Sequence, residues 1–337
     1  MKSSLSDLLT SKGILLADGA TGTNYFAMGL TAGEPPEFWN TDSPEKVVGL
    51  HQQFVDAGAD IILTNTFGCN RHRLKLHKAQ DRVFELARTA AELARSVADA
   101  ADRPVIVAGS VGPTGELFEP LGALTEAEAI DTFAEEISGL KAGGADVAWI
   151  ETMSSVEEVR AAAFGAIKAG MAYTATCSFD TAGRTMMGIL PSDMVSMFEG
   201  LPEAPIAFGA NCGVGASDIV VTLQSMQTTA SGHPLISKGN CGIPHFVGAE
   251  CVYSGTPELM GRYADLARRS GARIIGGCCG TSPEHLAAMR VALDRPIGDA
   301  SVPDMQTIVD ELGALTNSAP STASTDVGAA RRARRAR

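Results

Sequence analysis

Short apolar segments alternate with stretches of helical spacing along most of this chain, and this alternation limits the possible folds more than any other feature. Near-continuous apolar strands separated by amphipathic helices are typical of a parallel sheet covered by helices. The predicted strands are 14–17, 61–66, 105–108, 147–151, 173–177, 206–209, 235–237 and 274–275, and the predicted helices are 47–55, 81–100, 125–142, 155–168, 192–200, 215–229, 256–270 and 283–294. Eight strand–helix units match a single (β/α)₈ (TIM) barrel of the α/β class in number and in length.

A doubly wound open sheet is the structural alternative, but the chain fits it less well. The first strand-to-helix turn, residues 18–23, holds only part of the glycine fingerprint with which such sheets bind dinucleotides. We assign residues 1–298 to the barrel and 299–337 to a C-terminal extension. Because residues 315–327 are rich in Ser, Thr, Ala and Pro and the chain ends in an arginine-rich stretch, we expect the extension to be a disordered basic tail.

Composition narrows the class of protein. The net charge of −12 argues against a protein that binds nucleic acid. The sequence has neither a secretory signal at its start nor an apolar run near the ~20 residues that span a bilayer. Seven cysteines, an odd number, suggest reduced thiols. We therefore expect a cytoplasmic protein that binds neither nucleic acid nor membranes, and a homo-oligomer stays open.

Two adjacent cysteines, Cys278 and Cys279, lie in a Gly-Gly-Cys-Cys-Gly-Thr run directly after the last predicted strand. Thiolates are soft ligands that suit zinc, and the flanking glycines let the backbone approach whatever the thiolates hold. Two neighbouring thiols cannot complete a tetrahedral site. Cys212, in a glycine-rich run that follows another apolar strand, is the best candidate for a third ligand. Three protein ligands and one open position are the arrangement of a catalytic zinc.

Polar residues also end several of the predicted strands. In a barrel of this kind the active site lies at the C-terminal ends of the strands. Asp18, Thr64 and Glu151 stand at three of those ends, so with the cysteines they would ring one mouth. The carboxylates of Asp18 and Glu151 could hold a cationic group such as an amino-acid ammonium. The turn at Gly19-Ala20 could offer backbone N–H groups to a carboxylate.

Three thiolate ligands would fix the reactivity of the metal. They leave Zn²⁺ with a net charge of about −1, so the metal is a weak Lewis acid and activates water poorly. This disfavours a hydrolase. A substrate thiol in the open position would lose its proton, from an ordinary pKa near ~8.5, and would stay electron-rich. The predicted chemistry is therefore alkylation of sulfur, in which the bound thiolate attacks an electrophilic carbon.

Six short elements, taken together, identify a family. They are Asp18-Gly19, Thr64-Asn65-Thr66-Phe67, Gly112-Pro113-Thr114-Gly115-Glu116, Glu151-Thr152, Gly209-Ala210-Asn211-Cys212 and Gly276-Gly277-Cys278-Cys279-Gly280-Thr281. With these elements the sequence resembles the homocysteine S-methyltransferase family of zinc (β/α)₈ barrels, from Leu15 to about Leu293. The resemblance implies a methyltransferase of the EC 2.1.1 class that makes methionine from homocysteine and a methyl donor. It also implies that Cys212, Cys278 and Cys279 bind Zn²⁺ and that homocysteine is bound by Asp18, Gly19, Ala20, Thr64 and Glu151.

The family uses several methyl donors. A betaine site needs an aromatic cage for the quaternary ammonium, and Trp39 could be one wall; Asn211 and Cys241 are further candidates for the donor site. Betaine enzymes of the family carry tyrosines where this chain has Gly68 and Thr152. These departures, and the likeness of two motifs to the homocysteine module of cobalamin-dependent methionine synthase, favour a methylcorrinoid protein that docks as a separate chain. The alternative is betaine or a related onium compound, a sulfonium included.

A hypothesis of another class is a non-catalytic zinc or redox-sensing protein that uses the Cys278-Cys279 dithiol. The two hypotheses differ in whether the protein binds homocysteine in a metal-dependent way. Only in the enzyme should Cys212→Ala abolish zinc binding and activity together.

Overall fold

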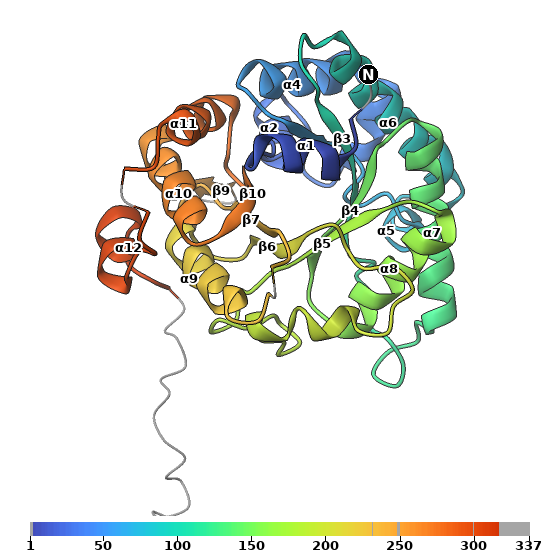
Figure 1. The fold of residues 1–337 in the computed structure, drawn as a ribbon. Coiled ribbons are helices and arrows are strands. Elements are labelled where there is room, and N and C mark those ends of the chain that lie inside the picture. Colours follow the sequence, from blue (N-terminus) through green and yellow to red (C-terminus); the bar gives the residue numbers. More distant parts are fainter. Residues whose placement is uncertain (1–2, 231, 248–249, 299, 317–337) are drawn as a thin grey trace, which may run out of the picture.

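The computed structural model describes residues 3–230, 232–247, 250–298 and 300–316 of the chain. Eight parallel strands form a barrel surrounded by helices, which confirms the predicted fold class (Figure 1). The strands are β1 (Leu15–Leu16), β2 (Ile61–Leu63), β3 (Ile106–Val111), β4 (Val147–Met153), β5 (Tyr173–Cys177), β6 (Phe208–Cys212), β7 (Leu235–Gly239) and β10 (Ala272–Gly277). Their hydrogen-bonded order is β1-β10-β7-β6-β5-β4-β3-β2. A parallel bridge between Ala17 and Ile61 brings the two outer strands of this order together.

Long helices pack around the barrel at all but one of the predicted positions. They are α4 (Pro44–Asp56), α6 (Val83–Ala100), α7 (Glu126–Ala142), α8 (Val156–Ala169), α9 (Ala216–Gln227), α10 (Pro257–Arg269) and α11 (Pro283–Asp294). The predicted helix at 192–200 is wrong, because two 3₁₀ turns, η3 (Pro191–Asp193) and η4 (Ser196–Phe198), stand there instead. Gly200, with a φ of 76°, ends this short segment, and short segments favour 3₁₀ geometry. Within the described ranges, each helix is too short or too polar to cross a bilayer.

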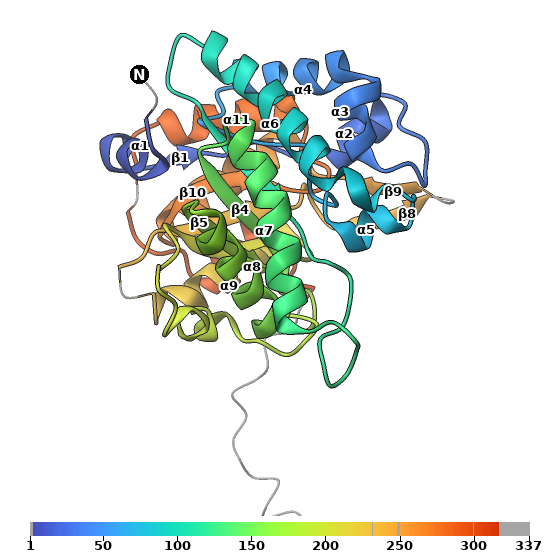
Figure 2. The same cartoon turned by 90° about the vertical axis from the view of Figure 1, so that its right-hand side faces the viewer.

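The strands separate an inner apolar core from an outer one. Ile106 and Ala108 of β3 belong to the inner core, whereas Val107 between them packs in the outer core beneath the helices. This alternation follows from the two-residue period of a strand. Buried leucines of α1 (Leu5–Lys12) complete the inner core, and Figure 2 shows α1 at one end of the barrel. That end is therefore closed by apolar side chains.

The opposite end carries the connections that follow the strands. Figure 2 shows α2 (Gly22–Ala27), α3 (Trp39–Asp42), α5 (Arg71–Lys75) and an antiparallel hairpin, β8 (Pro244–Val247) with β9 (Glu250–Tyr253), on this side. Two further 3₁₀ turns, η1 (Pro36–Phe38) and η2 (Gln80–Arg82), belong to the same connections. Segments at the C-terminal ends of barrel strands build the mouth in which such folds hold their substrates.

Two aspartates complete the seam between β1 and β2, which are only two and three residues long. The backbone N–H of Asp18 donates to the Ile61 carbonyl at 3.0 Å, and that of Asp60 donates to the Leu16 carbonyl at 2.7 Å. The Asp60 carboxylate accepts from the Leu16 N–H at 2.9 Å, and the Asp18 carboxylate accepts from the Leu63 N–H at 2.7 Å. In a longer pair of strands, backbone carbonyls would accept the hydrogen bonds from the Leu16 and Leu63 N–H groups. Here the two carboxylates accept them instead.

The C-terminal extension is folded where the structure describes it, so the expectation of disorder is wrong for its first part. Residues Met305–Leu312 form α12, which packs beside α9 and α10 (Figure 1). Ile308 and Leu312 are buried, and the Thr316 N–H donates to the Asp218 carboxylate at 3.2 Å. Apolar residues at helical spacing after residue 304 account for this helix. The arginine-rich end, within 317–337, lies outside the described residues.

His51, on α4, is fully buried, and neither ring nitrogen has a hydrogen-bond partner in the described part of the chain. Burial lowers the pKa of this imidazole to about 4. In the unfolded chain the ordinary pKa of about 6.5 applies, so the unfolded state takes up a proton first as the pH falls. The free energy of unfolding is therefore not reduced by His51 above pH ~6.5, and protonation of His51 in the unfolded state reduces it progressively as the pH falls below that value.

We predict that this linkage costs about 2 kcal/mol of the free energy of unfolding between pH 7.5 and pH 5.0. Denaturant unfolding of the wild type and of His51→Leu at both pH values measures it, and the wild type should lose about 2 kcal/mol more than the variant. His77→Gln, which removes an exposed histidine, is the matched control and should behave like the wild type. Equal losses in all three proteins would contradict the prediction.

Candidate active site at the mouth of the barrel

A layer of polar side chains covers the inner apolar core at the open end of the barrel. Ser110, Glu151 and Lys238 each follow an inner-core residue by two positions, and Asn211 follows one by four. Since side chains alternate along a strand, all four belong to the inner face of β3, β4, β6 and β7. The mouth therefore has a polar floor, and the rest of the site is built around it.

Three cysteines meet at one side of this floor. Cys212 ends β6, while Cys278 and Cys279 follow β10, and only β7 separates these two strands. The three Sγ atoms lie within 4.8 Å of one another, with 4.0 Å between those of Cys212 and Cys279. The Cys278 N–H donates to the Gly239 carbonyl at 2.7 Å, and the Cys241 N–H donates to the Cys279 carbonyl at 2.9 Å. These bonds to β7 and its extension fix the cysteine pair beside Cys212.

The spacing and chemistry of this cluster fit a zinc ion. Tetrahedral Zn²⁺ with Zn–S bonds of ~2.3 Å sets its sulfur ligands about 3.8 Å apart. Hydrogen bonds from Cys212 and Cys278 lower the pKa of the Cys279 thiol, while the pKa values of Cys212 and Cys278 are raised, so the cluster favours one thiolate, at Cys279. Thiolate is the form that binds a metal. In the ranges that the structure describes, this is the one group of three or more Cys, His, Asp or Glu side chains with such spacing.

Two residues of the site have a left-handed backbone that non-glycine residues seldom adopt. Thr152 has a φ of 62° and Cys212 a φ of 58°. The Asn211 amide holds both segments: its Oδ1 accepts from the Thr152 N–H at 2.8 Å, and its Nδ2 donates to the Thr152 hydroxyl at 2.7 Å. Nδ2 also lies 3.9 Å from the Cys278 sulfur. Asn211 therefore positions the residues around it and does not line the cavity.

Glu151 presents one carboxylate oxygen to the cavity. Its Oε1 accepts a hydrogen bond from the Ser110 hydroxyl at 2.5 Å, and the Ser110 N–H donates to the Thr64 hydroxyl at 3.0 Å. Its Oε2 has no hydrogen-bond partner among the described residues. Burial raises the pKa of Glu151 to about 7, although Lys238 nearby opposes the shift. A cation bound at Oε2 would favour the ionised carboxylate.

A buried ion pair lies beside Glu151. The Lys238 ammonium donates to Oδ1 of Asp18 at 2.8 Å, and both side chains are almost completely buried, at 3% and 0% exposed. Burial opposes the charge of Lys238, but the carboxylates of Asp18 and Glu151 outweigh it and raise the pKa of the ammonium. The other Asp18 oxygen accepts from the Leu63 N–H, so each oxygen of Asp18 already accepts one hydrogen bond from the protein.

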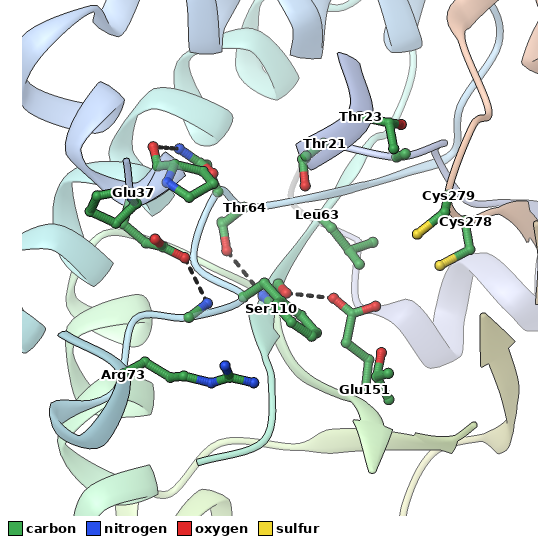
Figure 3. Close-up of a pocket in the computed structure, with 18 of the residues that line it drawn as sticks. Thr21, Thr23, Glu37, Leu63, Thr64, Arg73, Ser110, Glu151, Cys278 and Cys279 are labelled. Atoms are coloured by element: carbon green, nitrogen blue, oxygen red, sulfur yellow. Dashed lines mark hydrogen bonds between the residues drawn. The ribbon is translucent and has the colours of Figure 1, made fainter. Parts of the chain in front are cut away.

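One cavity of about 520 Å³ joins these groups (Figure 3). At its inner end, the sulfur atoms of Cys278 and Cys279 point into the cavity from one side, and Glu151, Ser110 and Thr64 form a connected set. Its outer end is lined by residues of short helices and loops, among them Glu37 and Arg73 on the far side from the cysteines and the half-exposed rings of Phe26 and Phe67. The cavity thus joins a thiol-rich end to an outer end with charges of both signs.

Most of the predicted site residues meet at this cavity. Those on its wall are Gly19, Ala20, Thr64, Glu151, Cys212, Cys278 and Cys279. Asp18 does not line the cavity, because it lies behind Lys238. Trp39 is buried against Tyr25 and Lys46, at 5.2 Å between ring centroids and 4.1 Å from Nζ to the ring centre, so it is no wall of a cage. The Cys241 side chain is also buried and off the wall.

Several wall residues were not predicted. Lys238 and Ser110 could have been found from strand parity, because each lies two positions past an apolar inward residue. Glu37 lies in the 3₁₀ turn η1 and Arg73 in the short helix α5, elements too short for a periodic pattern in the sequence to mark them.

Fold and site together define a (β/α)₈-barrel enzyme with a three-thiol centre. Residues 15–293 match the family model described as homocysteine S-methyltransferase, and the chain belongs to the homocysteine S-methyltransferase family. The predicted family and the predicted enzyme class, a methyltransferase, are thereby confirmed.

Two methionine synthases are similar in sequence. Those of Mycobacterium tuberculosis and Mycobacterium leprae are 30% and 28% identical over 305 and 306 residues, which is 86% of this chain. The chain spans about a quarter of their length, since the matched part is 25% of each relative. Among solved structures, the homocysteine methyltransferase MmuM of Escherichia coli has the same fold. Its oxidised form gives a TM-score of 0.71 at 24% identity, covering 84% of this chain and 97% of that one, and its metallated form gives 0.71 at 23%.

We predict that Cys212→Ala weakens zinc binding by at least about 100-fold, because it removes one of three ligands. Zinc content after dialysis against a graded series of chelator concentrations measures the loss. Cys241→Ala, which removes a buried thiol outside the cluster, is the matched control and should keep one zinc per chain. Full zinc retention by Cys212→Ala would exclude Cys212 as a ligand.

Proposed function

We propose that this protein is a zinc-dependent homocysteine S-methyltransferase that forms methionine. The observation that carries the proposal is the single cavity that joins three clustered thiols to the free oxygen of Glu151. The thiol cluster and the cation-binding oxygen of Glu151, which lie together at the inner end of the cavity, fit the thiol and the ammonium of homocysteine. A non-catalytic sensor would need no such cavity.

The residues of the chain have distinct roles in this proposal. Cys212, Cys278 and Cys279 would hold the zinc, which lowers the pKa of a substrate thiol and so supplies a nucleophile at neutral pH. Glu151, oriented by Ser110, would bind the substrate ammonium and fix the direction of the sulfur. The closed apolar end of the barrel keeps bulk water from the inner side of the site.

For the methyl donor we propose a methylcorrinoid protein that docks at the mouth as a separate chain. Three observations support this donor. The chain matches a quarter-length portion of proteins named methionine synthase, and it has Gly68 and Thr152 where betaine enzymes carry tyrosines. With Trp39 packed in the core, the described residues at the mouth also leave a quaternary ammonium without its expected tryptophan wall.

The outer end of the cavity favours a second candidate, a small zwitterionic onium donor such as betaine or a sulfonium amino acid. Glu37 is 3% exposed, its Oε1 accepts from the Gly68 N–H at 2.6 Å, and burial raises its pKa. The Arg73 guanidinium lines the same end, held by a bond from its Nε to the Pro113 carbonyl at 3.4 Å. A carboxylate at Arg73 and an onium group toward the cysteines would place a methyl group near the substrate sulfur.

Methionine formation by the zinc-loaded protein with homocysteine decides between the donors. We expect no methionine with betaine or S-methylmethionine alone and turnover once methylcobalamin or a methylcorrinoid protein is added. Robust turnover with either small donor would replace the docking proposal by the second candidate. No methionine under any condition would contradict the proposed function.

We predict that Glu151→Gln weakens homocysteine binding by about 10- to 100-fold, because a charge-assisted hydrogen bond to the ammonium is lost. Calorimetric titration of the zinc-loaded variant with homocysteine measures the change. Glu157→Gln, on the exposed side of α8, is the matched control and should bind like the wild type. An unchanged dissociation constant in Glu151→Gln would remove Glu151 from the proposed site.

If the donor is small and zwitterionic, Arg73→Gln should raise the KM for that donor by about 10-fold or more. The KM for homocysteine should stay unchanged, because Arg73 lies at the outer end of the cavity. Steady-state kinetics with each substrate varied in turn separate the two effects. Arg71→Gln, which removes an exposed arginine paired with Glu135, is the control for a change of charge alone.

A further inference from the structure

We infer that Lys238 is the residue that recognises the carboxylate of the thiol substrate. The inference rests on the proposed function and adds a specificity residue to it. In this arrangement Asp18, which the sequence pointed to as a ligand of the substrate ammonium, acts only as the anchor of Lys238.

The Lys238 ammonium has hydrogen-bond donors that no described residue uses. A lysine ammonium has three N–H donors and no acceptor. In the described part of the chain its one hydrogen-bond partner is Oδ1 of Asp18, so two donors remain. Lys238 is 2% exposed yet lines the cavity. A buried charge with unmet donors is costly, and an incoming carboxylate would satisfy both.

The position of Lys238 is fixed on several sides. Its strand, β7, lies between the strands that carry the cysteines, and the register pairs Lys238 with Asn211 and with Gly276. The ammonium lies 5.8 Å from the centre of the Trp149 ring, which belongs to the inner core. Asp18 is itself held by the Leu63 N–H. The cation is therefore a built part of the cavity floor.

Glu151 and Lys238 together match the charges of an amino acid. Glu151 and Lys238 both line the cavity, and Oε2 of Glu151 and two N–H donors of Lys238 have no hydrogen-bond partners among the described residues. The ammonium of homocysteine suits the first group and its carboxylate suits the second. Each oxygen of Asp18 already accepts a hydrogen bond, and Asp18 does not line the cavity, so the substrate ammonium would not reach it while Lys238 is in place. With both charged groups of the substrate engaged on the floor, its side chain is directed toward the thiol cluster.

The test compares homocysteine with two analogues that each lack one charged group. 3-Aminopropane-1-thiol lacks the carboxylate, and 4-mercaptobutanoate lacks the ammonium. Calorimetry on the zinc-loaded protein gives the dissociation constant for each ligand without any methyl donor. We expect the wild type to bind homocysteine about 10- to 100-fold more tightly than 3-aminopropane-1-thiol. In Lys238→Met the two ligands should bind within about 3-fold of each other.

A second variant controls for misfolding, which Lys238→Met could cause because it leaves the Asp18 carboxylate buried without its counter-ion. The double variant Asp18→Asn/Lys238→Met removes both charges and should also lose the preference for the carboxylate. Zinc content and thiolate-to-cobalt absorption of the cobalt-substituted proteins check that the thiol cluster is intact. Lys238→Arg, which keeps the charge, should retain at least part of the preference.

Three outcomes would contradict the inference. A wild-type preference that persists in both neutral variants would overturn it while leaving the proposed function intact. Tighter homocysteine binding by the Lys238→Met variant would also overturn it, since Lys238 would then be occupying the place of the substrate ammonium. If the wild type binds none of the three thiols when loaded with zinc, the proposed function fails and the inference fails with it.

Discussion

The carboxylate of Asp18 ties three strands together at the open end of the barrel. One oxygen accepts from β2, the other from Lys238 on β7, and the Asp18 backbone carbonyl accepts from the Gly277 N–H on β10 at 3.0 Å. Removing one partner from a buried ion pair commonly destabilises a protein by about 3–5 kcal/mol. This one residue therefore contributes to the closure of the barrel, to the charge of Lys238 and to the position of Lys238 on the cavity floor.

The two ends of the cavity have different structural origins. Strand residues build the inner end, where hydrogen bonds between neighbouring strands fix the position of each side chain. The outer end is built by loops and short helices, which tolerate changes in sequence and length more easily than barrel strands do. Under the proposed function, residues of the barrel strands would recognise the substrate thiol, whereas the loops and short helices would determine which methyl donor is used.

The sequence predicted the fold well because every barrel strand is apolar and every long helix is amphipathic. It also predicted the cysteine cluster, since motifs at two strand ends converge once the strand order is known. The role of Asp18 could not be read from its position at a strand end, because its partner Lys238 lies 220 residues away in the chain. The place of Trp39 off the cavity wall could not be predicted for a similar reason: its burial depends on contacts with Tyr25 and Lys46 that no local pattern marks. The prediction of a helix at 192–200 was wrong because this short segment, which ends at Gly200, forms two 3₁₀ turns instead.

The left-handed backbone at Cys212 has a consequence for how this site can change. A non-glycine residue in that conformation carries strain of roughly 1–3 kcal/mol, which glycine would relieve. The substitution Cys212→Gly would thus stabilise the fold, but it would also remove one sulfur from the cluster. Directed evolution for heat resistance alone would be drawn toward that loss, so selection for stability and selection for a working thiol centre oppose each other at this residue.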